Sequence, residues 1–219
     1  MAEELLITVS EFETRVAKLA GGAVQELHLA PASGYSLTGN IYLGRVERII
    51  QGMQAAFVDV GLERPGFLHV RDIEGPKLIV ADSGEGSDTP DIRDLLHEGQ
   101  KIMVQVAKDP ISGKGARLTS QLAIASRYMV LMPFTDHIGI SQRIEDEAER
   151  ARLRALIDEV RLEAGIGMGF IARTAVESAD REAIELDVRV LTRIWDKVLE
   201  KKANVGCPEV VYEELPLHI

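Results

Sequence analysis

The chain has 219 residues, of which 46% are hydrophobic and 27% are charged, so it is expected to fold as a globular protein with one large or two small domains. The formal net charge of -10 argues against a protein that coats nucleic acid nonspecifically, because such binding needs many Lys and Arg side chains to neutralise phosphates. No apolar run approaches the ~20 residues of a membrane span and no secretory signal is visible, so we expect a cytoplasmic protein without a membrane partner.

Two short apolar runs open the chain. Residues 5–9 and 24–29 are predicted to be strands joined by a turn region around Gly21 and Gly22, with residues 11–16 irregular. Residues 31–39 are small and polar, which is typical of a linker.

Short strands then follow one another at close intervals. A helix at residues 92–96 is predicted to precede the fourth of them, and residues 75–90 are rich in Gly, Ser, Asp and Pro, which favours a mobile loop. The predicted strands are residues 41–49, 53–60, 66–70, 102–107 and 116–119. Five short strands with a helical segment before the fourth are typical of an OB-fold barrel.

The pattern changes beyond residue 121. Residues 128–132 and 168–172 are predicted strands, and residues 145–163 form an amphipathic helix between them. Ser178 is the expected N-cap of a second helix. The expected buried stripe of that helix is Ile184, Val188, Leu191, Trp195 and Val198. A last strand is predicted at residues 210–212, and the chain stops soon after it, which suggests a fragment of a longer protein.

Two phenylalanines are the first candidates for RNA binding. Phe57 and Phe67 fall on neighbouring predicted strands, and aromatic rings on the outer face of a barrel can stack on bases. The alternative is that both rings fill the barrel core. These residues point to single-stranded nucleic acid, because only unpaired bases present their flat faces.

Nearby cations are the second group of candidates. The segment 101–117 carries four cations against one carboxylate, a local basic surface in an acidic chain. Lys114 lies between two glycines, which let a phosphate approach closely, although it could also be an ordinary turn lysine. Lys108 and Arg45 complete the set, and each taken alone is an ordinary surface cation.

Arg173 and Thr174 form a third candidate group, within the motif FIARTA. A guanidinium can bind two oxygens of a terminal phosphate and a hydroxyl can bind a third. The alternative is an arginine at a strand end that is paired with one of many nearby carboxylates.

No catalytic or metal-binding residue is assigned. The acidic residues lie on predicted helices among arginines, where we expect solvated, ion-paired faces rather than the convergent carboxylates of a two-metal site. They are Glu145, Asp146, Glu147, Glu149, Asp180, Glu182, Glu185 and Asp187. The single cysteine, Cys207, has no cysteine partner and is expected to be a free or structural thiol.

The longer motifs resemble one family. GNIYLGRV, GMQAAFVDVGLERPGFLH, KDPISGKGARLT, SRYMVLMP, ISQRIED and FIARTA are similar to the N-terminal half of the bacterial ribonuclease E/G family, and in particular to its ribonuclease G members. The resemblance implies an α+β, multidomain fold in which an S1-type OB-fold barrel is inserted in a partial RNase H-like subdomain and followed by an α/β 5′-sensor region. The implied parts are residues 1–38 (RNase H-like), 39–122 (S1-type), 123–203 (5′ sensor) and 204–219 (RNase H-like, truncated).

The resemblance also implies roles for single residues. Phe57, Phe67 and Lys114 would contact RNA, and Arg173 with Thr174 would bind its 5′-monophosphate. Two further residues would belong to that pocket: Val130 lines it, and Ser126 stands where the ribonuclease E branch has glycine.

By resemblance, the chain is the RNA-recognition portion of a single-strand-specific endoribonuclease of ribosomal and messenger RNA processing and decay. The catalytic domain would lie downstream, so the chain is expected to be inactive alone. The parent protein would use Mg²⁺ for hydrolysis and Zn²⁺ between subunits, and would form a homodimer or higher oligomer. Two alternatives are a stand-alone, non-catalytic RNA-binding module and a protein-interaction scaffold.

Overall fold

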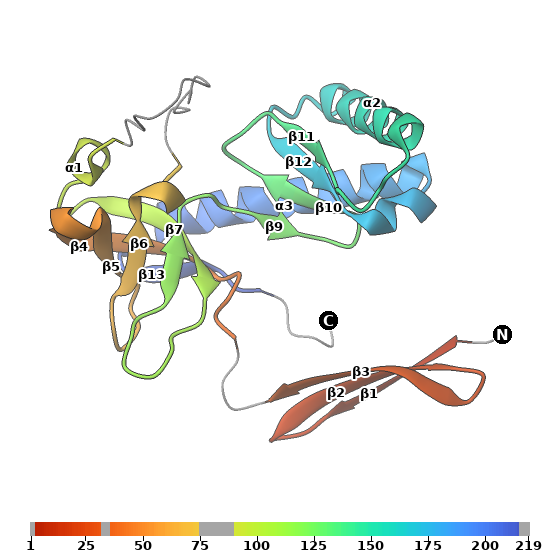
Figure 1. Ribbon diagram of the computed structural model, residues 1–219, viewed down its shortest axis with the longest axis horizontal. Helices are drawn as coiled ribbons and strands as arrows, with labels where there is room; N and C mark the ends of the chain where they lie inside the picture. Colours follow the sequence, from red (N-terminus) through yellow and green to blue (C-terminus); the bar gives the residue numbers. More distant parts are fainter. Residues whose placement is uncertain (1–2, 32–35, 75–89, 215–219) are drawn as a thin grey trace.

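The structure is a computed structural model that describes residues 3–31, 36–74 and 90–214. Its described residues form three sheets: a three-stranded N-terminal sheet, a barrel and a second mixed sheet that packs with two long helices (Figure 1). The predicted loop at residues 75–90 lies, except for Pro90, outside the described residues. No helix among the described residues is long and apolar enough to cross a membrane.

The N-terminal sheet is an antiparallel meander with the order β1-β2-β3. Its strands are β1 (Glu3–Val9), β2 (Glu13–Ala20) and β3 (Ala23–Pro31). The prediction of irregular structure at residues 11–16 holds for residues 11–12 but was wrong for residues 13–16, because the segment ETRVAKLA forms β2 and pairs with β1 and β3. Leu6 and Ile7 are both exposed although adjacent strand residues point to opposite faces, so neither face of β1 is covered by the residues that the structure describes.

The predicted OB-like barrel is confirmed as a closed five-stranded barrel with the order β4-β5-β6-β8-β7 and a closing β4–β7 pair. Its strands are β4 (Ile41–Ile50), β5 (Ala55–Asp59), β6 (Gly66–His69), β7 (Lys101–Lys108) and β8 (Arg117–Thr119). The short helix α1 (Ile92–Leu95) precedes the fourth barrel strand, as predicted. The barrel core is formed by Val46, Ala56, Val58, Leu68, Val104 and Leu118, among others.

Glycine lets the barrel strands approach closely at two places. A Cβ atom on Gly66 would lie 2.4 Å from Leu118 Cδ1, and one on Gly44 would lie 2.7 Å from Val58 Cγ1. Larger side chains at these positions would separate the strands, so these glycines allow the tight coiling of a small barrel.

The second sheet has the order β11-β12-β10-β9. Its strands are β9 (Ile124–Ala125), β10 (Met129–Met132), β11 (Ile138–Ile140) and β12 (Gly169–Ala172). β10 and β12 confirm the two predicted strands, whereas β9 and β11 were missed because two or three residues carry no readable period. The short 3₁₀ helices of the chain are η1 (Gln51–Met53), η2 (Val70–Asp72) and η3 (Thr174–Ser178).

Both long helices agree with prediction. The first is α2 (Glu147–Glu163), and the second is α3 (Arg181–Asn204), whose five predicted stripe residues are all buried. The predicted N-cap of α3 was wrong: Ser178 ends η3, and the Asp180 carboxylate accepts the N–H of Ala183 at 2.8 Å instead.

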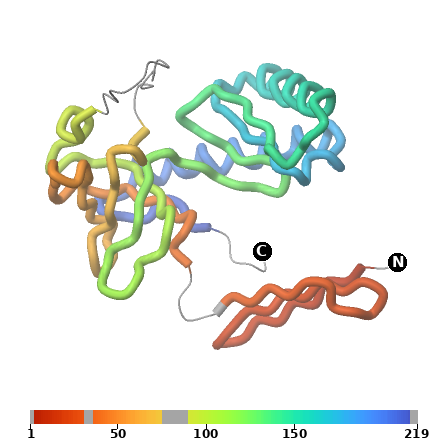
Figure 2. The backbone as a smooth tube through the Cα atoms, in the orientation of Figure 1, coloured from red at the N-terminus to blue at the C-terminus, as the bar shows by residue number. Residues whose placement is uncertain are grey.

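Helix α3 connects the second sheet to the barrel. It runs from the sheet back toward the barrel, where strand β13 (Glu209–Tyr212) pairs with β4 (Figure 2). Arg181 at the start of α3 forms ion pairs with three carboxylates, two of them on α2 and the third that of Glu185. Of the eight predicted acidic residues, Glu147, Glu149 and Glu185 form ion pairs, so the predicted ion-paired face is confirmed only for these three. The barrel and the sheet are therefore linked by one continuous helix.

Candidate nucleic-acid interface

Phe57 on β5 and Phe67 on β6 lie directly opposite each other on the outer face of the barrel. Their ring centroids are 6.0 Å apart, and the ring planes meet at 69° in an edge-to-face arrangement. Both side chains are half-buried, whereas the neighbours Ala56 and Val58 are fully buried. Because successive strand residues point to opposite faces, burying these neighbours turns the phenylalanine rings outward. The core alternative for the two rings was therefore wrong.

Cations flank the two rings in a single cross-strand row. Arg48 on β4 is opposite Phe57, Arg117 on β8 is opposite Phe67, and Lys108 on β7 is opposite Arg117. Opposite residues on paired strands have their side chains on the same face of the sheet. The five strands thus place two aromatic rings between basic side chains on the outer surface.

Beside the two rings lies a groove with a volume of about 680 Å³, within the range of ligand-binding clefts. Of the predicted RNA-binding residues, the groove is lined by Phe57, Phe67, Lys108 and Lys114, and Arg45 is not among its lining residues. Arg45 is opposite Asp59 and Lys101 in the barrel register instead. The structure therefore brings four of the five predicted residues together.

The loop between β7 and β8 forms one wall of this groove. The N–H of Lys114 donates to the Ile111 carbonyl at 2.8 Å, and Arg64 Nη1 donates to the Gly113 carbonyl at 2.6 Å. Gly113 has φ +78°, which side chains rarely adopt, so this turn depends on glycine. The tight turn holds Lys114 exposed at the rim of the groove.

The groove is electrostatically positive. Lys108 and Lys114 form no ion pair with any residue that the structure describes, whereas Arg117 pairs with Asp72 at 3.0 Å. Asp109 is the acidic residue among the lining side chains. Desolvation raises the Asp109 pKa, but hydrogen bonds from Ser36 and two backbone N–H groups outweigh it and hold the pKa below its ordinary value. This carboxylate therefore stays ionised and is satisfied within the protein.

The four predicted 5′-phosphate residues come together at one end of the second sheet. Val130 on β10 is opposite Ile171 of β12 and Ala125 of β9. Arg173 directly follows β12; its Nη1 donates to the Ser126 carbonyl, and Thr174 is the next residue. Val130 on β10, Ser126 just after β9, and Arg173 and Thr174 just after β12 thus lie at the same end of this sheet.

Arg173 has hydrogen-bond donors to spare. Its backbone N–H donates to the Tyr128 carbonyl at 2.8 Å, and its guanidinium lies within 4.0 Å of no carboxylate in the described parts of the chain. Among the described residues, the alternative of an ion-paired arginine at a strand end is therefore not borne out. Nε and Nη2 remain available, and a guanidinium presents such donors in a planar arrangement that suits a phosphate. Thr174 is half-buried beside it.

Asp187 of α3 holds the turn between β9 and β10 in place. Its Oδ2 accepts the Ser126 hydroxyl and the backbone N–H groups of Tyr128 at 3.2 Å and Met129 at 3.0 Å. Because that turn supplies the carbonyl of Ser126 to Arg173, Asp187 orients the arginine through the turn. The Ser126 hydroxyl is thus committed within the protein.

The sequence interpretation missed Asp187, Arg48 and Arg117 as site residues. Asp187 was assigned to a solvated, ion-paired face, which was wrong, and its position between Ile184 and Val188 of the buried stripe was an available signal. Arg117 was counted only among the four cations of segment 101–117, and Arg48 gave no local signal. The positions of both beside the rings depend on the register of long-range strand pairs.

The described residues contain no cluster of three or more potential metal ligands. Within residues 3–31, 36–74 and 90–214, no group of three or more His, Cys, Asp or Glu side chains could hold one. No step of the chemistry discussed below is therefore assigned to a metal on these residues.

Comparisons with known proteins place the chain beside bacterial ribonucleases. Residues 123–219 match the sequence profile of the "Ribonuclease E/G family". The chain is 45% identical over 218 residues to "Ribonuclease G" of Salmonella typhimurium (strain SL1344) and of Escherichia coli (strain K12), alignments that cover 99% of this chain and 44% of each relative. It is 37% identical over 206 residues to "Ribonuclease E" of Nostoc sp. (strain PCC 7120), which covers 94% of this chain and 28% of that protein. The chain thus spans less than half the length of these curated relatives.

Proposed function

The chain belongs to the ribonuclease E/G family, and we propose that it is the RNA-recognition portion of a single-strand-specific endoribonuclease of RNA processing and decay. The observation that carries the proposal is the cross-strand row in which Phe57 and Phe67 lie between Arg48 and Arg117. Single-stranded RNA offers both flat base faces and phosphates. Two outward-facing aromatic rings can stack on the bases, and lysines without ion pairs among the described residues can bind the phosphates.

In this proposal the groove of the barrel holds the strand. Bases stack on the rings, at about 1–3 kcal/mol for each base, and Lys108 and Lys114 neutralise the phosphates that run beside them. Stacking uses the π face that every base has, so binding is expected to tolerate many sequences. A base-paired duplex conceals those faces, which accounts for a preference for single strands.

The second site recognises the 5′ end. Nε and Nη2 of Arg173 and the hydroxyl of Thr174 donate to a terminal 5′-monophosphate, while Ser126 and Val130 form the wall around it. A 5′-hydroxyl end offers no negative charge to these donors. Discrimination between the two ends therefore comes from the phosphate alone, independently of the groove.

The remaining parts of the proposal concern the parent protein. The barrel is of the S1 type, residues 123–203 are the 5′ sensor, and β1–β3 belong to an RNase H-like subdomain. The boundaries at residues 38, 122 and 203 stay predictions, and the structure pairs β13 with barrel strand β4. The Mg²⁺ and Zn²⁺ sites, the oligomer interface and the hydrolytic step are proposed for regions other than these described residues, in a cytoplasmic enzyme. The chain alone is expected not to cleave RNA when Mg²⁺ is added.

The test is equilibrium binding of one single-stranded RNA with either a 5′-monophosphate or a 5′-hydroxyl, at one fixed salt concentration. Phe57→Ala is expected to weaken binding of both forms by about 1–3 kcal/mol. Arg173→Ala is expected to abolish the preference for the phosphorylated form and to leave the affinity for the hydroxyl form nearly unchanged.

Matched controls are available in the chain. Phe12→Ala removes a phenylalanine that is 80% exposed and outside the groove, and Arg154→Ala removes an exposed arginine without an ion pair among the described residues. If Phe57→Ala binds RNA as tightly as Phe12→Ala does, the groove is not the binding surface. Equal loss of both RNA forms in Arg173→Ala would refute the end-sensing role.

A further inference from the structure

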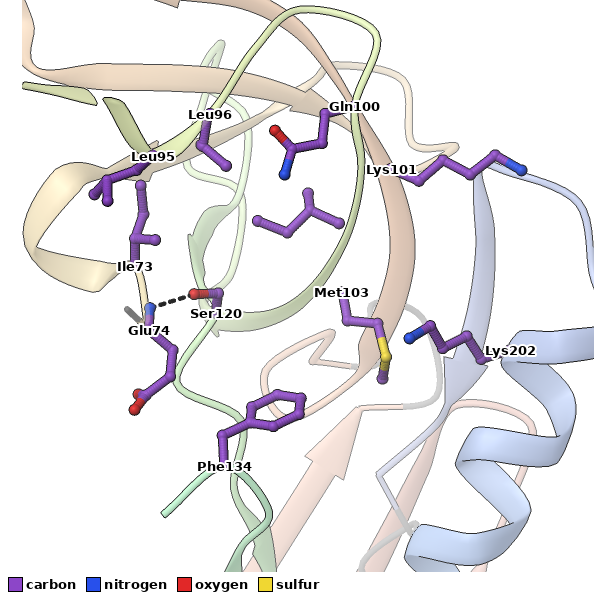
Figure 3. Close-up of a pocket in the computed structure, with 11 residues that line it drawn as sticks. Ile73, Glu74, Leu95, Leu96, Gln100, Lys101, Met103, Ser120, Phe134 and Lys202 are labelled. Atoms are coloured by element: carbon purple, nitrogen blue, oxygen red, sulfur yellow. Dashed lines mark hydrogen bonds between the residues drawn. The ribbon is translucent and has the colours of Figure 1, made fainter. Parts of the chain in front are cut away.

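A second cavity, of about 600 Å³, lies apart from both sites described above. It is bounded by the barrel, by Phe134 from the connection between β10 and β11, and by Lys202 near the end of α3 (Figure 3). Its volume lies in the range of small-molecule sites, and it shares no lining residue with the groove beside Phe57 and Phe67. It therefore needs its own explanation.

Phe134 presents an aromatic ring to this cavity. The side chain is 52% exposed, whereas Phe170 of the neighbouring strand β12 is fully buried. Trp195 supports the ring from one side in an edge-to-face contact, with centroids 5.7 Å apart and planes at 87°. The contact fixes the ring while leaving about half of it accessible, which is the arrangement that a stacking platform requires.

Polar groups converge on the same cavity. Lys101 of β7 and Lys202 of α3 lie on the same side of the cavity; in Figure 3 the Lys202 ammonium is turned toward the cavity and the Lys101 ammonium extends outward from it. Neither forms an ion pair with any residue described by the structure. The carboxylate of Glu74 is on the opposite side in the same view. Gln100 adds an amide whose Oε1 accepts the N–H of His97 at 3.0 Å. That bond orients the amide and leaves its NH₂ group as a donor toward the cavity.

We propose that this cavity binds one nucleotide of the same single-stranded RNA. The base stacks on Phe134, the Gln100 amide donates to an acceptor on the base edge, and a backbone phosphate lies at the rim of Lys101 and Lys202. The proposal rests on the proposed function and adds a subsite to it. The site lies where the barrel and α3 meet, so an RNA that occupies it contacts both parts of the chain.

The chain contains a built-in reporter for this site. Trp195 is the only tryptophan and contacts Phe134, so its fluorescence is expected to change when a base stacks on that ring. The probe is 5′-hydroxyl oligouridylate of about 20 nucleotides, longer than the roughly 4–16 nucleotides that one OB fold covers. Saturation of the Trp195 signal at the concentration that saturates RNA binding is the expected result.

Two variants test the contacts through the affinity for the same RNA. Phe134→Leu keeps apolar contact with Trp195 but removes the flat ring, and is expected to weaken binding roughly fivefold or more. Lys101→Gln combined with Lys202→Gln is expected to lower the slope of the logarithmic salt dependence by about 0.7, the contribution of one single-strand phosphate. Lys197→Gln, an exposed lysine on the same helix, is the control and should leave both quantities unchanged.

The outcomes separate this inference from the proposed function. If Phe57→Ala weakens binding while Phe134→Leu and the double lysine variant match the wild type, the subsite is refuted and the groove stands. If the wild-type chain does not bind the RNA, both fail. If uridine 5′-monophosphate saturates the Trp195 signal while RNA leaves it unchanged, the cavity is a free-nucleotide site, and the RNA subsite is refuted.

Discussion

We predict that Asp187→Ala abolishes the preference for 5′-monophosphate RNA and leaves the affinity for 5′-hydroxyl RNA nearly unchanged. Asp187 contacts neither the groove nor, in the proposed mode, the phosphate. Its carboxylate instead holds the turn whose carbonyls bind Arg173. Loss of the carboxylate releases that turn, and the guanidinium then loses its fixed orientation.

The size of the effect follows from the hydrogen bonds. A hydrogen bond to a charged group contributes about 1.5–3 kcal/mol, and two backbone N–H groups depend on Asp187. The Ser126 hydroxyl also donates to the Met129 carbonyl at 2.9 Å, so loss of its hydrogen bond to Asp187 costs little. Because Asp187 is half-buried and water can replace it in part, we take about 2–3 kcal/mol for the turn. Because 1.4 kcal/mol corresponds to a tenfold change in an equilibrium constant, the equilibrium between the ordered and the released turn shifts roughly 30- to 150-fold toward the released form.

The assay is the ratio of the dissociation constants for 5′-hydroxyl and 5′-monophosphate RNA. Asp187→Ala is expected to bring this ratio to about one, whereas Asp187→Asn, which keeps an acceptor oxygen, should retain most of the preference. Asp196→Ala removes an exposed carboxylate from the same helix and serves as the control. Unchanged binding of 5′-hydroxyl RNA shows that the barrel is folded. A full preference in Asp187→Ala would refute the positioning role.

Two further predictions concern stability in urea. Gly115→Ala is expected to destabilise the chain by about 1–3 kcal/mol, because the added Cβ would lie 1.9 Å from the Pro65 carbonyl oxygen. Gly52→Ala, whose Cβ would have no atom within 4 Å, is the control. Equal stability of the two variants would contradict this prediction. The pKa of Asp109 is lower in the folded state than in the unfolded state, where it is near 3.8. The ionised carboxylate therefore stabilises the fold at pH values above 3.8, and this contribution is lost as the pH falls through the lower pKa of the folded state. Asp109→Asn should therefore unfold more easily at neutral pH and lose part of the acid dependence, and parallel pH profiles for the two proteins would exclude this linkage.

The sequence was sufficient for elements with a strong local period. The five-residue stripe of α3 repeats at helical spacing, so helix and buried face could both be predicted. The barrel strands were recognisable because short segments rich in apolar residues are separated by glycines. Strand β2 was not predicted, because its residues are mostly charged or small. It forms by pairing with β1 and β3 rather than through an alternating apolar pattern of its own.

The candidate sites divide in the same way. Phe57 and Lys114 were recognisable from residue type and local spacing, but the decision between core and surface depended on which face of β5 is buried. Arg48 reaches the row only because the register shifts between Val46 and Arg48, which no local pattern encodes. The cavity at Phe134 combines β7, the connection after β10 and the end of α3, so only the assembled fold defines it.

The acidic balance of the chain bears on how these sites would work together. With a net charge of -10, the body as a whole repels RNA, and this long-range repulsion is screened over about 10 Å at 0.1 M salt. Contacts within the groove act at shorter range and are less affected by that repulsion. A strand that lies in the groove with its bases on Phe57 and Phe67 gains these contacts, whereas a strand that touches the surface elsewhere gains few. The combination of an acidic body and a basic, aromatic groove therefore favours a defined path for the RNA over nonspecific coating.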